Sequence, residues 1–208
     1  MIQSETGIKR NVRFEYPARF EAGPPSPGVL LEMGVRGGPQ PRTTMRLRSL
    51  AAEHAMAGGA EEGEFDELAI VEVEVLASER TLVEKLALLH GLAAGVQEEG
   101  GQDRLERSGR HYYDVHRLLG HQATLDACAQ AGCVAGLAED IDIQSRRYGW
   151  SSSPRPALGY AQSPAFDPSH PSHEAAEAGY RRAAALVFGA VPTFEECVAR
   201  VHANAAIL

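Results

Sequence analysis

Long apolar runs, cysteines and lysines are the scarce features of this 208-residue sequence. No run of about 18 consecutive apolar residues occurs, so the sequence offers no candidate membrane span. The N-terminal residues also lack the apolar core of a secretory signal. The three cysteines, Cys128, Cys133 and Cys197, are too few and too irregularly spaced for a disulfide framework or a structural zinc site. We therefore expect idle or buried thiols in a cytoplasmic protein.

Positive charge is also scarce, since the net charge is −8 and the pI is about 5.5. This balance excludes a passive nucleic-acid coat, which needs a basic surface. Eighteen of the 20 basic residues are arginines, and only Lys9 and Lys85 are lysines. Six arginines could still line a local basic cleft, namely Arg46, Arg48, Arg104, Arg107, Arg110 and Arg117. A solvated surface with acidic neighbours accounts for the same arginines equally well.

The order of the expected elements predicts an α+β protein, with strands at the front and helices behind. Strands are expected at 13–16, 29–35 and 70–76, the last from alternating valine and glutamate. Helices are expected at 42–57, 82–94, 109–119, 122–147 (one or two), 174–188 and 193–202. Capping boxes are expected at Thr81 with Glu84 and at Thr193 with Glu196. The polar segment 97–107 and the proline-rich segment 149–171 are expected to be loops.

Lys85 and Asp114 form the first candidate site, because two successive predicted helices carry them. Lys85 lies near the edge of an apolar stripe formed by Leu82, Leu86, Leu89 and Ala93, so it could meet Asp114 across the helix pair. Lysine is a common partner for phosphate, and aspartate can hold a metal or orient a nucleophile. A structural ion pair, or two unrelated surface charges, remains the alternative.

Other ionisable residues give weaker signals. Glu32 sits in an apolar strand, where it either is buried with a partner or faces solvent. Asp140 and Asp142 form a D-x-D pair, but no Gly-Ser or Gly-Thr turn precedes it and its neighbours are typical of a solvated helix. His111 lies one turn from Asp114, and a hydrogen-bonding histidine without catalytic function is the alternative.

Four segments together resemble one family, the nucleotidyl transferase toxins of the AbiEii/AbiGii group, which are related to the MenT toxins. The segments are 29–34 (VLLEMG), 79–90 (ERTLVEKLALLH), 110–118 (RHYYDVHRL) and 180–196. The second and third are the most specific. The resemblance extends from about residue 10 to the end of the chain.

The resemblance implies the remainder of a nucleotidyltransferase-type, polymerase-beta-like α+β core at 1–95 and a helical region at 96–208. It implies transfer of a nucleotide from an NTP, with Mg²⁺, to an acceptor such as the 3′ end of tRNA, and an antitoxin encoded nearby. Lys85 matches the lysine expected on the triphosphate, and Asp114 matches the late aspartate. Glu32 is expected as a third acidic residue.

The resemblance also implies supporting roles for other residues. Arg80, Arg110 and His111 are expected to bind substrate. Glu32 and Asp114 are expected to hold the metal.

The sequence departs from the family at its first motif, a Gly-Ser or Gly-Thr turn followed by D-x-D that holds the metals. This motif is not found, so we expect an N-terminally truncated member that binds Mg²⁺ weakly. A non-catalytic remnant or interaction module is the alternative, binding nucleotide, RNA or a partner chain, including a second copy in a homodimer. An unrelated metal-dependent hydrolase using Asp140, Asp142 and His111 is a third hypothesis.

Overall fold

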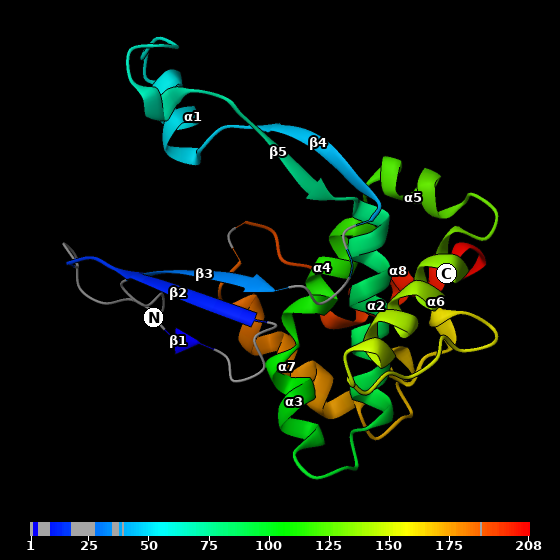
Figure 1. Cartoon of the computed structure of the whole chain (residues 1–208). Coiled ribbons are helices and arrows are strands. Elements are labelled where there is room, and N and C mark those ends of the chain that lie inside the picture. The colour runs from blue at the N-terminus through cyan, green and yellow to red at the C-terminus, as the bar shows by residue number, and fades with distance from the viewer. Residues whose placement is uncertain (1, 4–8, 18–27, 35–37, 39, 188) are drawn as a thin grey trace.

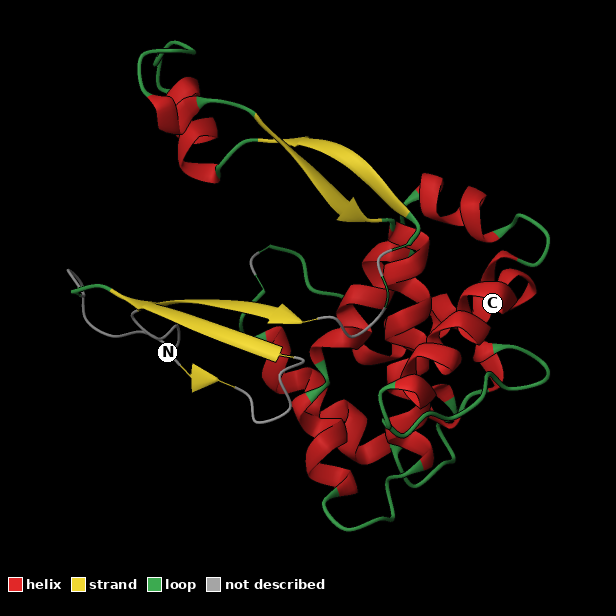
Figure 2. Ribbon diagram, in the orientation of Figure 1, coloured by secondary structure: helices red, strands yellow, loops and turns green. Residues whose placement is uncertain are grey.

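The computed structural model describes residues 2–3, 9–17, 28–34, 38, 40–187 and 189–208. Within these ranges, five strands form two small antiparallel sheets (Figures 1 and 2). The first sheet has the order β1-β2-β3, and the second consists of β4 and β5. Their bounds are β1 Ile2–Gln3, β2 Lys9–Glu15, β3 Gly28–Gly34, β4 Arg42–Leu47 and β5 Val71–Leu76.

Eight α-helices and four short 3₁₀ helices make up the rest of the regular structure in the same described ranges. Their bounds are α1 Leu50–Ala57, α2 Ser78–Ala94, α3 Gly101–Arg107, α4 Arg110–Leu118, α5 Gln122–Cys128, α6 Cys133–Arg147, α7 His173–Ala184 and α8 Phe194–Ala203. Figure 2 shows the strands on one side and most of the helices on the other. The predicted α+β fold is therefore confirmed. Among the described residues, no helix has the length and apolarity needed to cross a bilayer.

Helix α2 is the centre of the helical body. It contacts α3, α4, α5 and α6, and the stripe predicted from its sequence is fully buried, since Leu82, Leu86, Leu89 and Ala93 are each 0% exposed. Aromatic residues of later helices complete the core, with the Tyr112 ring 4.9 Å from that of Phe194 in an edge-to-face arrangement. The helix that carries Lys85 is thus held rigidly by apolar contacts on several sides. The division at residues 95 and 96 stays a prediction.

The start of α2 differs from the prediction. The helix begins at Ser78 rather than Leu82, and Ala77 is its N-cap residue. The hydroxyl of Thr81 donates to the carbonyl of Ala77 at 3.2 Å, a bond inside the first turn rather than a cap. The capping box predicted at Thr81 is therefore wrong, because Thr and Glu at this spacing also occur inside a helix. The box predicted at Thr193 and Glu196 is confirmed at the start of α8.

Two further segments differ from their predicted structure. Residues 42–47 form strand β4 rather than the start of a helix, because Thr43 and Met45 pair with Val75 and Val73 of β5. The predicted loop at 97–107 contains α3, whose Leu105 is fully buried. Gly101 is required at its first position, since a Cβ there would lie 2.3 Å from the carbonyl oxygen of Gly95.

The β4–β5 hairpin projects from the helical body and carries α1 at its far end (Figure 1). One face of the hairpin is apolar and exposed, with Met45 opposite Val73 and Leu47 opposite Val71. The other face is charged, and the Arg42 and Glu74 side chains form an ion pair of 2.7 Å. Opposite faces of one ribbon thus have opposite polarity, as strand alternation requires.

Candidate functional site

Lys85, His111 and Asp114 come together where α2 packs against α4. The Lys85 Nζ lies 3.4 Å from Asp114 Oδ2 and 3.1 Å from His111 Nδ1, and His111 Nδ1 lies 3.0 Å from Asp114 Oδ2. His111 is buried, whereas Lys85 and Asp114 keep 26% and 36% of their side chains exposed. The structure therefore brings together the two residues that could meet according to the sequence, as an ion pair, and their functional roles stay predictions.

The three side chains are coupled electrostatically. Burial alone would raise the pKa of Asp114, but the hydrogen bond with His111 and the charge of Lys85 outweigh it, so that this pKa lies below its usual value. Asp114 is consequently ionised at neutral pH. The tautomer of His111 decides whether Nδ1 donates to Asp114 or accepts from Lys85. The result is a partly exposed ammonium group whose position is fixed by a carboxylate and an imidazole.

A cavity of about 790 Å³ opens beside this group. Its lining includes one side of α2, parts of α6, and the segment Trp150–Ser153, with Lys85 and His111 contributing to it. Glu84 also lines the cavity; burial raises its pKa, although the hydrogen bond and charge of Arg80 lower it. A cavity of this size suits a small-molecule ligand, for which volumes of roughly 300–1,000 Å³ are usual.

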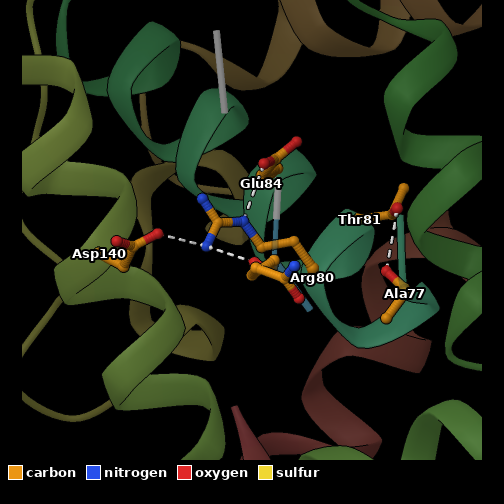
Figure 3. Close-up of polar contacts among 6 residues, drawn as sticks. Ala77, Arg80, Thr81, Glu84 and Asp140 are labelled. Atoms are coloured by element: carbon orange, nitrogen blue, oxygen red, sulfur yellow. Dashed lines mark hydrogen bonds and ion pairs between the residues drawn. The ribbon is translucent and has the colours of Figure 1, made fainter. Parts of the chain in front are cut away.

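Arg80 is buried in an ion-pair cluster at the start of α2 (Figure 3). Its Nε donates to Glu84 Oε1 at 2.9 Å, and its Nη1 donates to Asp140 Oδ2 at 2.5 Å and to the carbonyl of Gln40 at 3.2 Å. Only 1% of the side chain is exposed. These contacts join α2 to α6 and to the chain entering β4. The predicted role of Arg80 in substrate binding stays a prediction.

Two other predicted site residues lie on exposed surfaces. Glu32 is on β3, opposite Asn11 of β2, and its side chain is exposed rather than buried. Arg110 opens α4 and is exposed, and it forms no hydrogen bond or ion pair with any described residue. Arg110 is thus available to an anionic ligand near the start of the helix that carries His111 and Asp114.

Asp140 and Asp142 are engaged in protein contacts on α6. Asp140 pairs with Arg80, and Asp142 pairs with Arg146 at 2.6 Å and accepts from Ser152. Across the described ranges, no three or more His, Cys, Asp or Glu side chains are arranged to hold a metal ion. Asp140, Asp142 and His111 therefore do not assemble as a metal-dependent hydrolase would require, and that hypothesis is wrong.

The same test bears on the expected Mg²⁺. Mg²⁺ takes six oxygen ligands in octahedral geometry, of which one or two are protein carboxylates and the others are waters and substrate phosphates. The Oδ2 of Asp114 contacts Lys85 and His111, and Glu32 and Asp114 belong to no metal-binding group of three among the described residues. The described residues thus include no cluster of three or more protein ligands for a metal ion, and a site built on Asp114 would complete its coordination with water and phosphate oxygens.

Comparison with known proteins assigns the chain to one family. The chain matches the family described as nucleotidyl transferase AbiEii toxin, type IV toxin–antitoxin system, over residues 2–200. The chain belongs to this nucleotidyltransferase toxin family. The searches found no match among curated proteins and none among solved structures.

Sequence reasoning missed the cavity and the segment that closes one side of it. Residues 150–153 were expected only to be loop, and Glu84 only to cap a helix. One signal was present, because Gly149 follows the helical stretch 122–147 and glycine is common just after a helix C-terminus. The contact of Trp150–Ser153 with the side of α2 depends on tertiary packing, which local spacing does not report.

Proposed function

We propose that this chain is a toxin that transfers a nucleotide from an NTP to an RNA acceptor such as the 3′ end of tRNA, in the cytoplasm. One observation carries the proposal: the Lys85 ammonium is held by Asp114 and His111 beside a cavity of small-molecule size. Together with membership of a nucleotidyltransferase family, it supports a site that receives a triphosphate.

The charge of each residue determines its proposed role. Lys85 neutralises the triphosphate, with Arg110 as a further cationic group toward phosphate. The buried Arg80 acts on the substrate site only through Glu84, with which it pairs. Asp114, ionised at neutral pH, orients the acceptor hydroxyl, and His111 positions Asp114 by donating from Nδ1 to its Oδ2. The hydroxyl oxygen attacks the α-phosphorus, the bond to the bridging oxygen breaks, pyrophosphate leaves, and the hydroxyl proton passes to water. Glu32 is the third acidic residue of the proposed site.

Mg²⁺ would neutralise charge on the transferring phosphate in such a reaction. Because the described residues do not form a complete site for it, no step above depends on a metal bound by them. The proposal therefore rests on Lys85 and the groups that hold it.

The decisive experiment is a transfer assay with labelled NTPs, tRNA and Mg²⁺. We expect label on the RNA, and we expect Lys85→Ala to lower the rate at least about 100-fold, as for the loss of one electrostatic contact in a transition state. Lys85→Arg should not restore full activity, because a guanidinium group is not equivalent to a compact ammonium group. Lys9→Ala is the matched control, since Lys9 is the only other lysine. Transfer that survives Lys85→Ala would overturn the proposal.

The cognate antitoxin is the expected biological partner, because the family belongs to a type IV toxin–antitoxin system. Expression of the chain should arrest growth, and co-expression of the neighbouring antitoxin gene should relieve the arrest. Lys85→Ala should abolish the arrest. Equal arrest by the Lys85→Ala variant would separate toxicity from nucleotide transfer.

A second candidate function is that of a non-catalytic interaction module. The exposed apolar face of the β4–β5 hairpin favours it, since Met45, Leu47, Val71 and Val73 are 39–55% exposed. A second copy of the chain is the proposed occupant, because two such faces stack with their charged faces outward. Light scattering should then report a homodimer that Val73→Glu dissociates. A monomer at all concentrations would contradict this candidate.

A further inference from the structure

The cavity beside Lys85 extends along one side of α2, which contributes lining residues over three turns. Eight residues between Glu84 and Gly95 belong to the lining, and Gly95 is the residue that caps the helix. At 1.5 Å per residue this side is about 16 Å long. A triphosphate at Lys85 would occupy one part of such a cavity and leave space for the remainder of a nucleotide. The remaining lining residues determine which part of a ligand fits there.

A helix-terminating motif brings Trp150 to the cavity. Gly149 adopts a φ of +69°, which is a left-handed conformation, just after α6. The amide of Trp150 donates to the carbonyl of Ser145 at 2.9 Å, and that of Gly149 donates to Arg146 at 3.1 Å. These two bonds define a Schellman motif. The chain therefore turns sharply, and Trp150 and the three serines after it line the cavity.

Two side-chain contacts fix this segment in place. Ser152 donates to Asp142 of α6, and the His90 ring of α2 hydrogen-bonds to the backbone of Pro154. The second nitrogen of His90, Nδ1, lies 2.9 Å from Ser163 Oγ, and burial lowers the pKa of His90. The neutral imidazole thus bridges two points of the 149–171 segment. The wall containing Trp150 is preorganised rather than formed on binding.

The indole of Trp150 is itself part of an aromatic stack. Its ring centroid lies 5.0 Å from that of Tyr148, with 29° between the planes, and the Arg147 guanidinium lies 5.9 Å from the Tyr148 ring. Trp150 is half-buried and lines the cavity. A half-buried indole supported by a second ring is a suitable surface for stacking a planar base.

The charges of the lining indicate which ligand fits. The acidic residues of the lining, Glu84, Glu98 and Asp142, are each paired with an arginine. Arg104, which pairs with Glu98 at 3.2 Å, and Lys85 are the basic residues of the lining. Away from Lys85, the lining would therefore not attract a phosphate backbone. It consists largely of small or apolar side chains and hydroxyl or amide groups, including Ala87, Leu88, Gly91, Gln144 and Ser153. This composition suits an uncharged, planar, hydrogen-bonding body.

We infer that the cavity binds the nucleoside part of the NTP, with the base packed against Trp150 and its polar edge facing the serines, and with the phosphates toward Lys85. The inference rests on the proposed function and adds a subsite for the base. Trp150 is then a substrate-binding residue that sets affinity for the NTP, whereas the RNA acceptor lies outside this cavity.

Trp150 is the only tryptophan in the chain, so its fluorescence reports on this site alone. The full chain is titrated with ATP, GTP, CTP and UTP in the presence of Mg²⁺, and binding is measured in parallel by equilibrium dialysis. At least one NTP should change the fluorescence saturably, and inorganic tripolyphosphate should not. Binding without a fluorescence change, or no binding of any NTP, would overturn the inference, as would a response to RNA alone.

Substitutions separate this subsite from the catalytic proposal. Trp150→Ala should weaken NTP binding, and raise the KM for NTP in the transfer assay, by about tenfold through lost stacking. Trp150→Phe should stay within about twofold of the wild type. Leu158→Ala, at a residue 81% exposed in the same loop and outside the cavity lining, is the control.

The two proposals fail in different ways. Transfer with an unchanged KM in Trp150→Ala would reject the base subsite and leave the proposed function intact. The opposite outcome combines three results: the wild type shows an NTP-dependent fluorescence change, Trp150→Ala binds the NTP more weakly in dialysis, and no transfer occurs. That outcome would reject the proposed function and leave the subsite intact.

Discussion

The helical body and the β4–β5 hairpin differ in how far they bury their apolar side chains. In the body, Leu82, Leu86 and Leu89 on one face of α2 are 0% exposed. In the hairpin, Met45 and Val73 are 46% and 39% exposed, although they pair correctly across the strands. The comparison shows that secondary structure alone does not stabilise a ribbon. A two-stranded hairpin gains most of its stability from what covers its apolar face.

The largest effect should come from a cavity in the body. Leu86→Ala should lower the free energy of unfolding by about 3 kcal/mol, because it leaves a void among fully buried neighbours. Met45→Ala in the hairpin should cost less than about 0.5 kcal/mol in the monomer, since much of its side chain is already hydrated. Urea denaturation of both variants measures the difference. Equal costs would mean that the hairpin is packed in solution.

The next largest effect should come from the Arg80 cluster. Arg80→Met removes the guanidinium group from Glu84 and Asp140, so we expect the free energy of unfolding to fall by about 2 kcal/mol. This loss is smaller than for a fully buried ion pair, because both carboxylates retain some exposure. Asp140→Asn should cost less, since Arg80 keeps its bonds to Glu84 and Gln40. Chemical denaturation distinguishes the roles of Arg80. If the stability of Arg80→Met equals that of the wild type, a role of Arg80 in substrate binding is favoured over a role in positioning α2 against α6.

A smaller effect with a defined pH dependence should come from Asp114. Its native pKa lies below the usual value, so the ionised carboxylate stabilises the fold above a pH of about 4, and this contribution is lost as the pH falls through the native pKa. Asp114→Asn should therefore cost less than about 1 kcal/mol at pH 7, because the group is partly exposed.

The pH profile provides the control. The difference between the wild type and Asp114→Asn should be constant from about pH 5 to 8 and should shrink below about pH 4. Asp103→Asn, at an exposed position of α3, should show no such profile. A difference that grows in acid would contradict the direction of the pKa shift.

The smallest effect should come from the charged face of the hairpin. Arg42→Ala breaks the exposed ion pair with Glu74 and should change the free energy of unfolding by about 0.3 kcal/mol, since such pairs are screened by water and salt. The change should disappear in 1 M salt. A cost above about 1 kcal/mol would indicate that this face is less hydrated than its exposure implies.

The sequence predicted those parts of the fold whose cause is local or periodic. The stripe on α2 requires burial at every third or fourth residue, and that spacing alone positioned Lys85 toward the helix bearing Asp114. Strand β4 was missed because Thr43 and Met45 form a strand only when Val75 and Val73 lie opposite. Helix α3 was missed because its glycine permits a close approach to Gly95 that no local pattern reports.

For the candidate site, as for the fold, the sequence indicated local features and missed contacts between distant segments. Helix spacing made a contact of Lys85 with Asp114 possible without requiring it, whereas the contact of Arg80 with Asp140 joins residues 60 positions apart. The cavity wall at Trp150 depends on a turn, two side-chain bonds and the position of α2 together. Pairings between distant segments are therefore the part of this site that one sequence could not supply.

The segment 149–171 has a consequence for proteolysis. It is long and rich in proline, and its regular structure is limited to two short 3₁₀ helices, Tyr160–Gln162 and Pro164–Phe166. Such a segment is usually the first place that a protease cuts. Yet Tyr160, Ser163 and Phe166 are buried within it, and its hydrogen bonds lead to α2 and α6. A protease would first cut the exposed turn at the far end of the hairpin, around residues 58–64, and would leave this segment intact. Susceptibility to cleavage in this molecule follows burial rather than the absence of regular structure.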